Sequence, residues 1–258
     1  MSLTRFRHDS NPEFHPIDNM PPPDDLKKIF TEASAAVLQA FNRSNTQAGG
    51  DATPAQLIDA VNQFFIIYEK LGSKHNENSL IKKTDISQIG DETINCLIEL
   101  GSWAERLDLQ HEKAMLDEIA LAATHWVIRH QGEIRSLEAI VNMLAAKANR
   151  TSDTEVLSAL FHVMYDVIEH TSPELKSDAD KSDPSRPWRM LNFNFAIVAT
   201  RTMNKELMIK AFDTLGRNLP EDCPGFFEEG LKQSEKAVYG PEIKAMMAEY
   251  FKKWTTLH

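Results

Sequence analysis

Apolar residues recur at intervals of three and four positions along most of this chain, the spacing that gathers them on one face of an α-helix. No stretch alternates apolar and polar residues for long enough to predict a strand, and the chain has no Asn-Gly or Asp-Gly hairpin turn. The pattern therefore predicts an all-α fold of about ten helices. The first helix is predicted to begin after the proline run 21–23. The others are predicted over 54–72, 91–107, 112–130, 134–148, 153–170, 188–203, 205–218, 224–237 and 241–254.

Several predicted helix starts carry residues that favour this position. Thr53 precedes a proline, which suits an N-cap followed by the first helical residue. Ser152 stands three residues before Glu155, the spacing of a capping box. Pro224 and Pro241 each suit the first position of a helix. Because the connections between the helices are mostly short, we expect a stack of antiparallel hairpins.

Two segments lack the helical pattern. Residues 1–23 are polar and rich in proline, which predicts an extended or disordered arm. Residues 171–187 carry one large apolar side chain, Leu175, over a length that is unusual for a loop in a compact domain. We expect this polar insert to be a mobile spacer, with a functional segment as the alternative. The rest of the chain, 24–258, is expected to form a single all-α helical-repeat domain.

The segment from Asn192 to Pro220 is similar to a degenerate tetratricopeptide repeat. Ala196 occupies the small position of the first helix, Phe212 the aromatic position of the second helix, and Pro220 the closing proline. The resemblance implies a right-handed superhelix of helical hairpins, whose concave groove binds peptides in a protein-interaction scaffold.

The residues of that segment carry this resemblance, whereas the rest of the chain shares only helix length and turn spacing, and the segment itself departs from the family pattern. Asn192 and Ala199 stand where the family has Trp and Tyr, and Met208 stands at the small position of the second helix. The family's carboxylate clamp cannot be placed on this sequence. The resemblance therefore implies no ligand residues here.

The charge balance excludes some partners. Acidic residues outnumber basic ones by 38 to 28, giving a formal net charge of −10 and a pI near 5.4. This argues against binding to nucleic acid, which relies on Lys and Arg, and against adhesion to anionic membrane. The chain has two cysteines, and no apolar run is long enough for a signal peptide or a spanning helix. We therefore expect a cytoplasmic protein without disulfides, whose acidity favours a basic partner surface.

The strongest metal-like pattern is His162, Asp166 and His170, at positions i, i+4 and i+8 of one predicted helix. At about 100° per residue they fall opposite the apolar stripe around Leu157, which indicates a solvated polar face. The sequence also has no nucleophile elbow, phosphate-binding loop or dinucleotide fingerprint. We therefore expect no metal, no cofactor and no catalytic residues.

Two clusters have the composition of a binding surface. Arginine with tryptophan, as at the edges of the apolar helix 188–203, is typical of interaction hot spots. Methionine and aromatic side chains, as along the last helix, suit adaptable partner surfaces. The residues that we assign to partner binding are Arg186, Trp188, Arg189, Arg201, Met247 and Trp254. The alternative is that Trp188 anchors the start of its helix and that the last helix packs in the core.

These features favour a non-enzymatic scaffold that binds a protein or peptide in a helical-repeat groove. One alternative is an all-α enzyme with a buried pocket to which His125, His130 or Asp117 contributes, although His130 is expected to meet free carbonyls at a helix end. Another alternative is a homo-oligomer, in which the stripe of the last helix joins two copies. That stripe comprises Ile243, Met246, Met247, Tyr250 and Trp254. A scaffold requires an open groove, whereas an enzyme requires convergent polar groups in a closed pocket.

Overall fold

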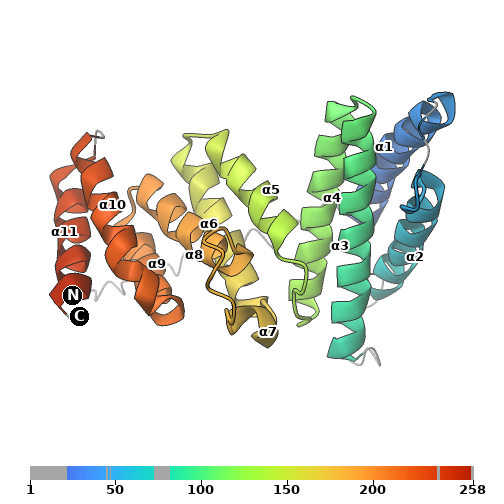
Figure 1. The fold of residues 1–258 in the computed structure, drawn as a ribbon. Helices are drawn as coiled ribbons and strands as arrows, with labels where there is room; N and C mark the ends of the chain where they lie inside the picture. Colours follow the sequence, from blue (N-terminus) through green and yellow to red (C-terminus); the bar gives the residue numbers. More distant parts are fainter. Residues whose placement is uncertain (1–21, 45, 47, 73–81, 237–238, 257–258) are drawn as a thin grey trace, which may run out of the picture.

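The helices follow one another along an elongated molecule in chain order, from α1–α4 at one end to α9–α11 at the other (Figure 1). A computed structural model describes residues 22–44, 46, 48–72, 82–236 and 239–256. The predicted N-terminal arm lies almost wholly outside the described residues. Within them no strand is present, and the only β-type contact is an isolated bridge between Ile134 and Thr171. The all-α prediction is therefore confirmed.

Eleven α-helices and one 3₁₀ turn are present in the described part of the chain. The elements are α1 (Pro23–Arg43), α2 (Pro54–Gly72), α3 (Lys83–Arg106), α4 (Gln110–Arg129), α5 (Glu138–Asn149), α6 (Thr154–His170), α7 (Pro173–Lys176), α8 (Pro187–Arg201), α9 (Lys205–Asn218), η2 (Pro220–Asp222), α10 (Cys223–Lys236) and α11 (Pro241–Thr256). None of them is both long enough and apolar enough to cross a membrane.

Three predicted helix starts agree with the structure, including that of α9 at Lys205. Helix α2 begins at Pro54, and Thr53 caps it: the backbone N–H of Thr53 donates to Gln56 Oε1 at 2.9 Å, while Thr53 Oγ1 accepts from the backbone of Gln56 at 3.4 Å. Helix α11 begins at Pro241. Helices α2 and α11 both start where a proline has no N–H to leave unpaired.

Several predicted helix starts are wrong, among them that of α5, which begins at Glu138 and not at residue 134. Helix α6 is capped by Asp153, not Ser152, because the Asp153 carboxylate accepts from the backbone N–H groups of Glu155 and Val156. Helix α10 begins at Cys223, one residue before the expected proline, because η2 runs directly into it. Helix α3 begins at Lys83, eight residues earlier than the pattern indicates. Its first turns contain weak helix formers, and burial of Ile86 against the core offsets that weakness.

Helices α1–α4 close into a ring. Helix α1 packs against α2 and α4, α2 packs against α3, and α3 packs against α4. Aromatic contacts fill the centre, including Phe30 on Phe65 with ring centroids 5.4 Å apart and Phe64 on Trp126 at 5.2 Å. This closed set of contacts is that of a four-helix bundle, so the stack of hairpins describes the later helices better than the first four.

The later helices pack pairwise along the chain. Helix α8 contacts α5, α6 and α9, and α10 packs chiefly against α11. The segment with the repeat-like pattern is the α8–α9 pair, in which Ala196 and Phe212 are both fully buried. Phe161 stacks on Phe195 at 4.5 Å, and Phe212 meets Phe227 edge-on at 5.1 Å, so aromatic side chains continue the core from α6 to α10.

Candidate functional site

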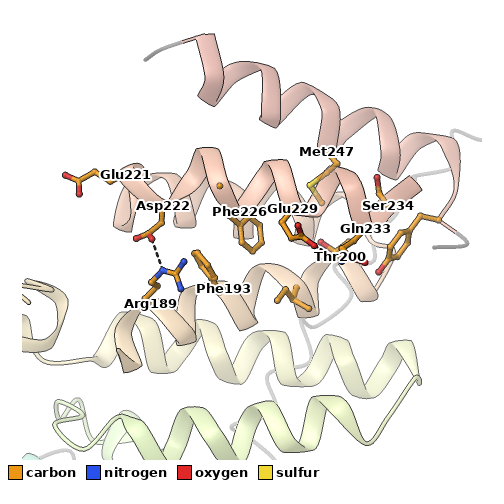
Figure 2. Close-up of a pocket in the computed structure, with 14 residues that line it drawn as sticks. Arg189, Phe193, Thr200, Glu221, Asp222, Phe226, Glu229, Gln233, Ser234 and Met247 are labelled. Carbon is orange, nitrogen blue, oxygen red and sulfur yellow. Dashed lines mark hydrogen bonds and ion pairs between the residues drawn. The ribbon is translucent and has the colours of Figure 1, made fainter. Parts of the chain in front are cut away.

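A groove of about 690 Å³ lies between α8 and α10, with α11 closing one side (Figure 2). We call it the α8–α10 groove. Its lining residues are Arg189, Phe193, Ile197 and Thr200 of α8, Glu221 and Asp222 of η2, Gly225, Phe226, Glu229, Gly230, Gln233 and Ser234 of α10, Tyr239, and Met247 of α11. Helices α8 and α10 are not among the closely packed helix pairs of the described chain, which leaves this space between them.

Helical spacing explains why these side chains face one another. The α8 residues from Arg189 to Thr200 recur at intervals of four, four and three, so they share one face of the helix. The residues of η2 and α10 from Asp222 to Gln233 recur at intervals of four, three and four on the opposing face. Eleven steps of 1.5 Å make each face about 17 Å long. The groove is therefore as long as three helical turns.

The floor of the groove is apolar and partly open to solvent. Phe193 and Phe226 meet across it with ring centroids 4.9 Å apart. Ile197 lies one turn after Phe193 and is 47% exposed, although most large apolar side chains of this chain are buried. Gly225 adds open space, since a Cβ atom built there would meet no other atom within 4 Å. Large apolar side chains exposed in a concave site mark a place where a ligand or partner can bind.

One end of the groove is closed by an ion-pair network. Arg189 Nε donates to Asp222 Oδ1 at 2.7 Å, as the dashed line in Figure 2 shows, and the Arg189 guanidinium lies 4.0 Å from the centre of the Phe193 ring. Arg186 donates to the other oxygen of Asp222 at 3.0 Å and to Asp178 Oδ1 at 2.7 Å. The hydrogen bond to Asp178 raises the pKa of the Arg186 guanidinium. The network thereby attaches the polar insert 171–187 to η2, directly before α10.

The other end of the groove is polar and acidic. Glu229 Oε1 accepts a hydrogen bond of 2.6 Å from the Gln233 side chain. Ser234 is buried, and its hydroxyl donates to the Leu231 carbonyl at 2.7 Å. At the opposite end, next to Asp222, Cys223 is buried outside the groove lining, and burial raises the pKa of its thiol to about 12. The thiol is therefore protonated at neutral pH.

The residues assigned to partner binding do not form one cluster. Arg189 and Met247 line the groove, and Arg186 lies behind Arg189 in the ion-pair network. Trp188 is buried and borders a separate, smaller cavity of about 260 Å³. Arg201 donates to the backbone carbonyls of Ala148 and Thr151, at 2.9 Å and 2.5 Å, and so ties the end of α8 to the end of α5.

The stripe on α11 packs inside the same chain. Trp254 lies against Gly216 of α9, where a Cβ atom would approach the indole to 2.5 Å. The Tyr250 hydroxyl donates to Asp213 at 2.9 Å, and Met247 lies against Gly230 of α10. Ile243 and Met246 are buried as well. The stripe therefore has intrachain neighbours along its length, and we base no homo-oligomer on it.

The histidine-rich face of α6 makes local contacts. The ring nitrogens Nδ1 of His162 and His170 lie 2.8 Å and 2.9 Å from backbone oxygens one turn earlier in the helix. No group of His, Cys, Asp and Glu side chains suited to holding a metal ion occurs in the described part of the chain.

The side chains named in the enzyme hypothesis have separate surroundings on α4. Asp117 pairs with Lys113 at 2.8 Å. His130 lies at the end of the helix with Nδ1 2.8 Å from the Trp126 carbonyl oxygen, but this carbonyl also accepts from the backbone N–H of His130 at 3.1 Å and so is not the free carbonyl that was expected. The Nδ1 atom of His125 is buried and has no hydrogen-bond partner among the described residues. None of the three lines the α8–α10 groove.

His125 gives a pH-dependence prediction. Burial lowers the pKa of His125 below its ordinary value of 6.5, so the unfolded chain binds this proton more readily than the folded chain. The stabilising contribution of a neutral His125 is complete above pH 6.5 and is lost as the pH falls through 6.5 toward the lower folded pKa. His125→Gln should therefore show a smaller loss of unfolding free energy between pH 7.5 and pH 5.5 than the wild type.

Urea denaturation at both pH values measures this loss. The variant His111→Gln, at an exposed position, is the control and should keep the wild-type dependence on pH. An equal loss in all three proteins would contradict the prediction.

Most of the groove was not predicted from the sequence. Phe193, Ile197, Phe226 and Glu229 were not among the assigned residues. One signal was available: the middle of α8 is apolar on more faces than a helix needs for a single core contact. That surplus indicates a second apolar surface, but it does not name the opposing helix.

Comparisons with known proteins found no match for this chain among protein-family models, curated proteins or solved structures. The geometry of the groove is therefore the basis for inferring a function.

Proposed function

We propose that this protein is a non-enzymatic binding module that holds an apolar segment of a protein partner in the α8–α10 groove. The observation that carries the proposal is the exposure of Ile197 in the middle of the groove, beside Phe193 and Phe226. Packing inside the chain leaves the Ile197 side chain 47% exposed. A partner side chain placed beside it would remove this apolar surface from water.

The dimensions favour a helical segment. A groove of about 17 Å between two helices accommodates the face of a third helix of about three turns. Such a helix would place apolar side chains from positions i, i+4 and i+7 along Phe193, Ile197 and Phe226. The occupant would thus pack between α8 and α10 as a third helix.

The tetratricopeptide-like superhelix remains part of the proposal. Its support is the α8–α9 pair, in which the expected small and aromatic positions, Ala196 and Phe212, are both buried. In that family peptides bind in a groove between helices, which agrees in kind with the site proposed here.

The proposal is tested by selecting peptides from a displayed library of random helical segments against the full chain, and by measuring their affinity with fluorescence anisotropy. Ile197→Asp should weaken binding of the selected peptides at least tenfold, because it places a charge in the apolar floor. Ile66→Asp is the matched control, since Ile66 on α2 is 41% exposed and lies outside the groove. It should leave binding unchanged.

Two results would overturn the proposal. One is a selection that yields no peptide above background. The other is a set of peptides whose affinity is the same for the wild type and for Ile197→Asp. Circular dichroism on both variants shows that a loss of binding is not a loss of fold.

A further inference from the structure

The charges around the α8–α10 groove are unevenly distributed. Four lining side chains carry formal charge: Arg189, Glu221, Asp222 and Glu229. The single cation, Arg189, forms an ion pair with Asp222, with 2.7 Å between Nε and Oδ1. Arg186 forms a second ion pair with the same carboxylate. Glu221 is paired with Lys181 at 2.8 Å. At this end of the groove, acidic and basic groups balance one another.

Glu229 is placed differently. Its hydrogen-bond partner is the neutral amide of Gln233, and among the described side chains none forms an ion pair with it. Lys232 on the same helix forms its ion pair with Glu228 at 2.7 Å and has only a weaker electrostatic interaction with Glu229. Glu229 follows Phe226 by three residues and so stands beside the apolar floor, and Figure 2 shows it pointing from α10 toward α8.

We propose that the segment bound in the groove is basic and amphipathic, with a large apolar side chain on Phe193 and Phe226 and a Lys or Arg side chain paired with Glu229. This inference rests on the proposed function and specifies the chemistry of its partner. The aliphatic stem of Lys or Arg would cover the Phe226 ring while the charged end reaches the carboxylate. The net charge of −10 adds long-range attraction for a basic segment.

The test uses two synthetic amphipathic peptides of about three helical turns. They share one leucine- and phenylalanine-bearing face and differ only at the flanking positions, which are lysine in one peptide and glutamate in the other. The full chain should bind the lysine peptide at least tenfold more tightly than the glutamate peptide, and added salt should reduce the difference. The variant Glu229→Lys should lose or reverse this preference.

Glu228→Lys is the matched control. Glu228 is adjacent, is also exposed on α10 and lies outside the groove lining, and its reversal changes the net charge by the same amount. It should keep the preference for lysine. If Glu228→Lys and Glu229→Lys shift the preference equally, the effect is one of net charge and the pairing with Glu229 is wrong.

The outcomes separate this inference from the proposed function. If both peptides bind equally and Ile197→Asp abolishes both, the groove binds segments but the inferred charge selectivity is wrong. If neither peptide binds while library-selected peptides do, the inferred partner chemistry is wrong and the proposed function stands. If no peptide of either origin binds, the proposed function fails, and this inference fails with it.

Discussion

Gly90→Ala is expected to lower the free energy of unfolding by about 3 kcal/mol, the upper part of the range for overpacking a core. Gly90 is buried inside α3, and a Cβ atom there would collide with Val127 Cγ2 of α4. Helices α3 and α4 pack closely together, and Val127 is itself buried. The new methyl group at position 90 and the Val127 side chain therefore have no free space to move into. Urea denaturation followed by tryptophan fluorescence measures the change.

Gly225→Ala is the control for this prediction. Gly225 lies in α10, where a Cβ atom would meet nothing within 4 Å, so alanine should stabilise the helix by about 0.5–1 kcal/mol. A second check is the pair Gly90→Ala with Val127→Ala, in which the smaller side chain on α4 makes room for the new methyl group. The double variant should be more stable than the sum of the single changes implies. Additive losses, or equal effects of alanine at positions 90 and 225, would contradict the steric explanation.

Arg186→Ala is expected to have the largest effect of any change near the groove, a loss of about 3–5 kcal/mol in unfolding free energy. The Arg186 side chain is 11% exposed and that of Asp178 is 8% exposed. The second oxygen of Asp178 is buried without a hydrogen-bond partner among the described residues. Removing the guanidinium therefore leaves the buried Asp178 carboxylate without its ion pair and its side-chain hydrogen bond, with only a longer-range attraction to exposed Lys181. The measurement is urea denaturation at pH 7.

Two further variants separate this explanation from a loss of packing. Lys181→Ala removes an exposed ion pair with Glu221 and should change stability by less than about 1 kcal/mol. Adding Asp178→Asn to Arg186→Ala removes the unpaired charge and should restore part of the lost stability. If Arg186→Ala costs no more than Lys181→Ala, the network does not stabilise the chain.

The all-α character of the fold followed from the sequence because helical periodicity is a local property. The spacing of apolar residues determines which side chains share a helix face, whatever that face contacts. Helix starts were less predictable. At α6 both Ser152 and Asp153 are suitable caps, and only the backbone geometry selects Asp153. At α3, the buried contact of Ile86 extends a helix that its residues alone would not favour.

The groove could not be predicted in the same way, because it depends on the distance between two helices that are not consecutive. Phe193 and Phe226 are separated by α9 in the sequence, and nothing in either segment indicates that their rings meet. The composition around Arg186 and Arg189 indicates a binding surface, but their partners Asp178 and Asp222 lie in segments whose sequence predicts polar loops. The sequence therefore indicated which residues were unusual without indicating which of them are already paired.

The position of the groove has a consequence for how binding would be regulated. One wall is α8, held by α5, α6 and α9, while the other is the α10–α11 pair, whose closest packing is internal. Segments with few contacts to the rest of a structure open locally at lower free energy than densely packed ones. An occupant that touches both walls would stabilise the docked state of the α10–α11 pair by mass action, so we expect bound peptide to slow amide hydrogen exchange throughout α10 and α11. Faster opening of this pair would then shorten the lifetime of the complex without any change in the contacts themselves.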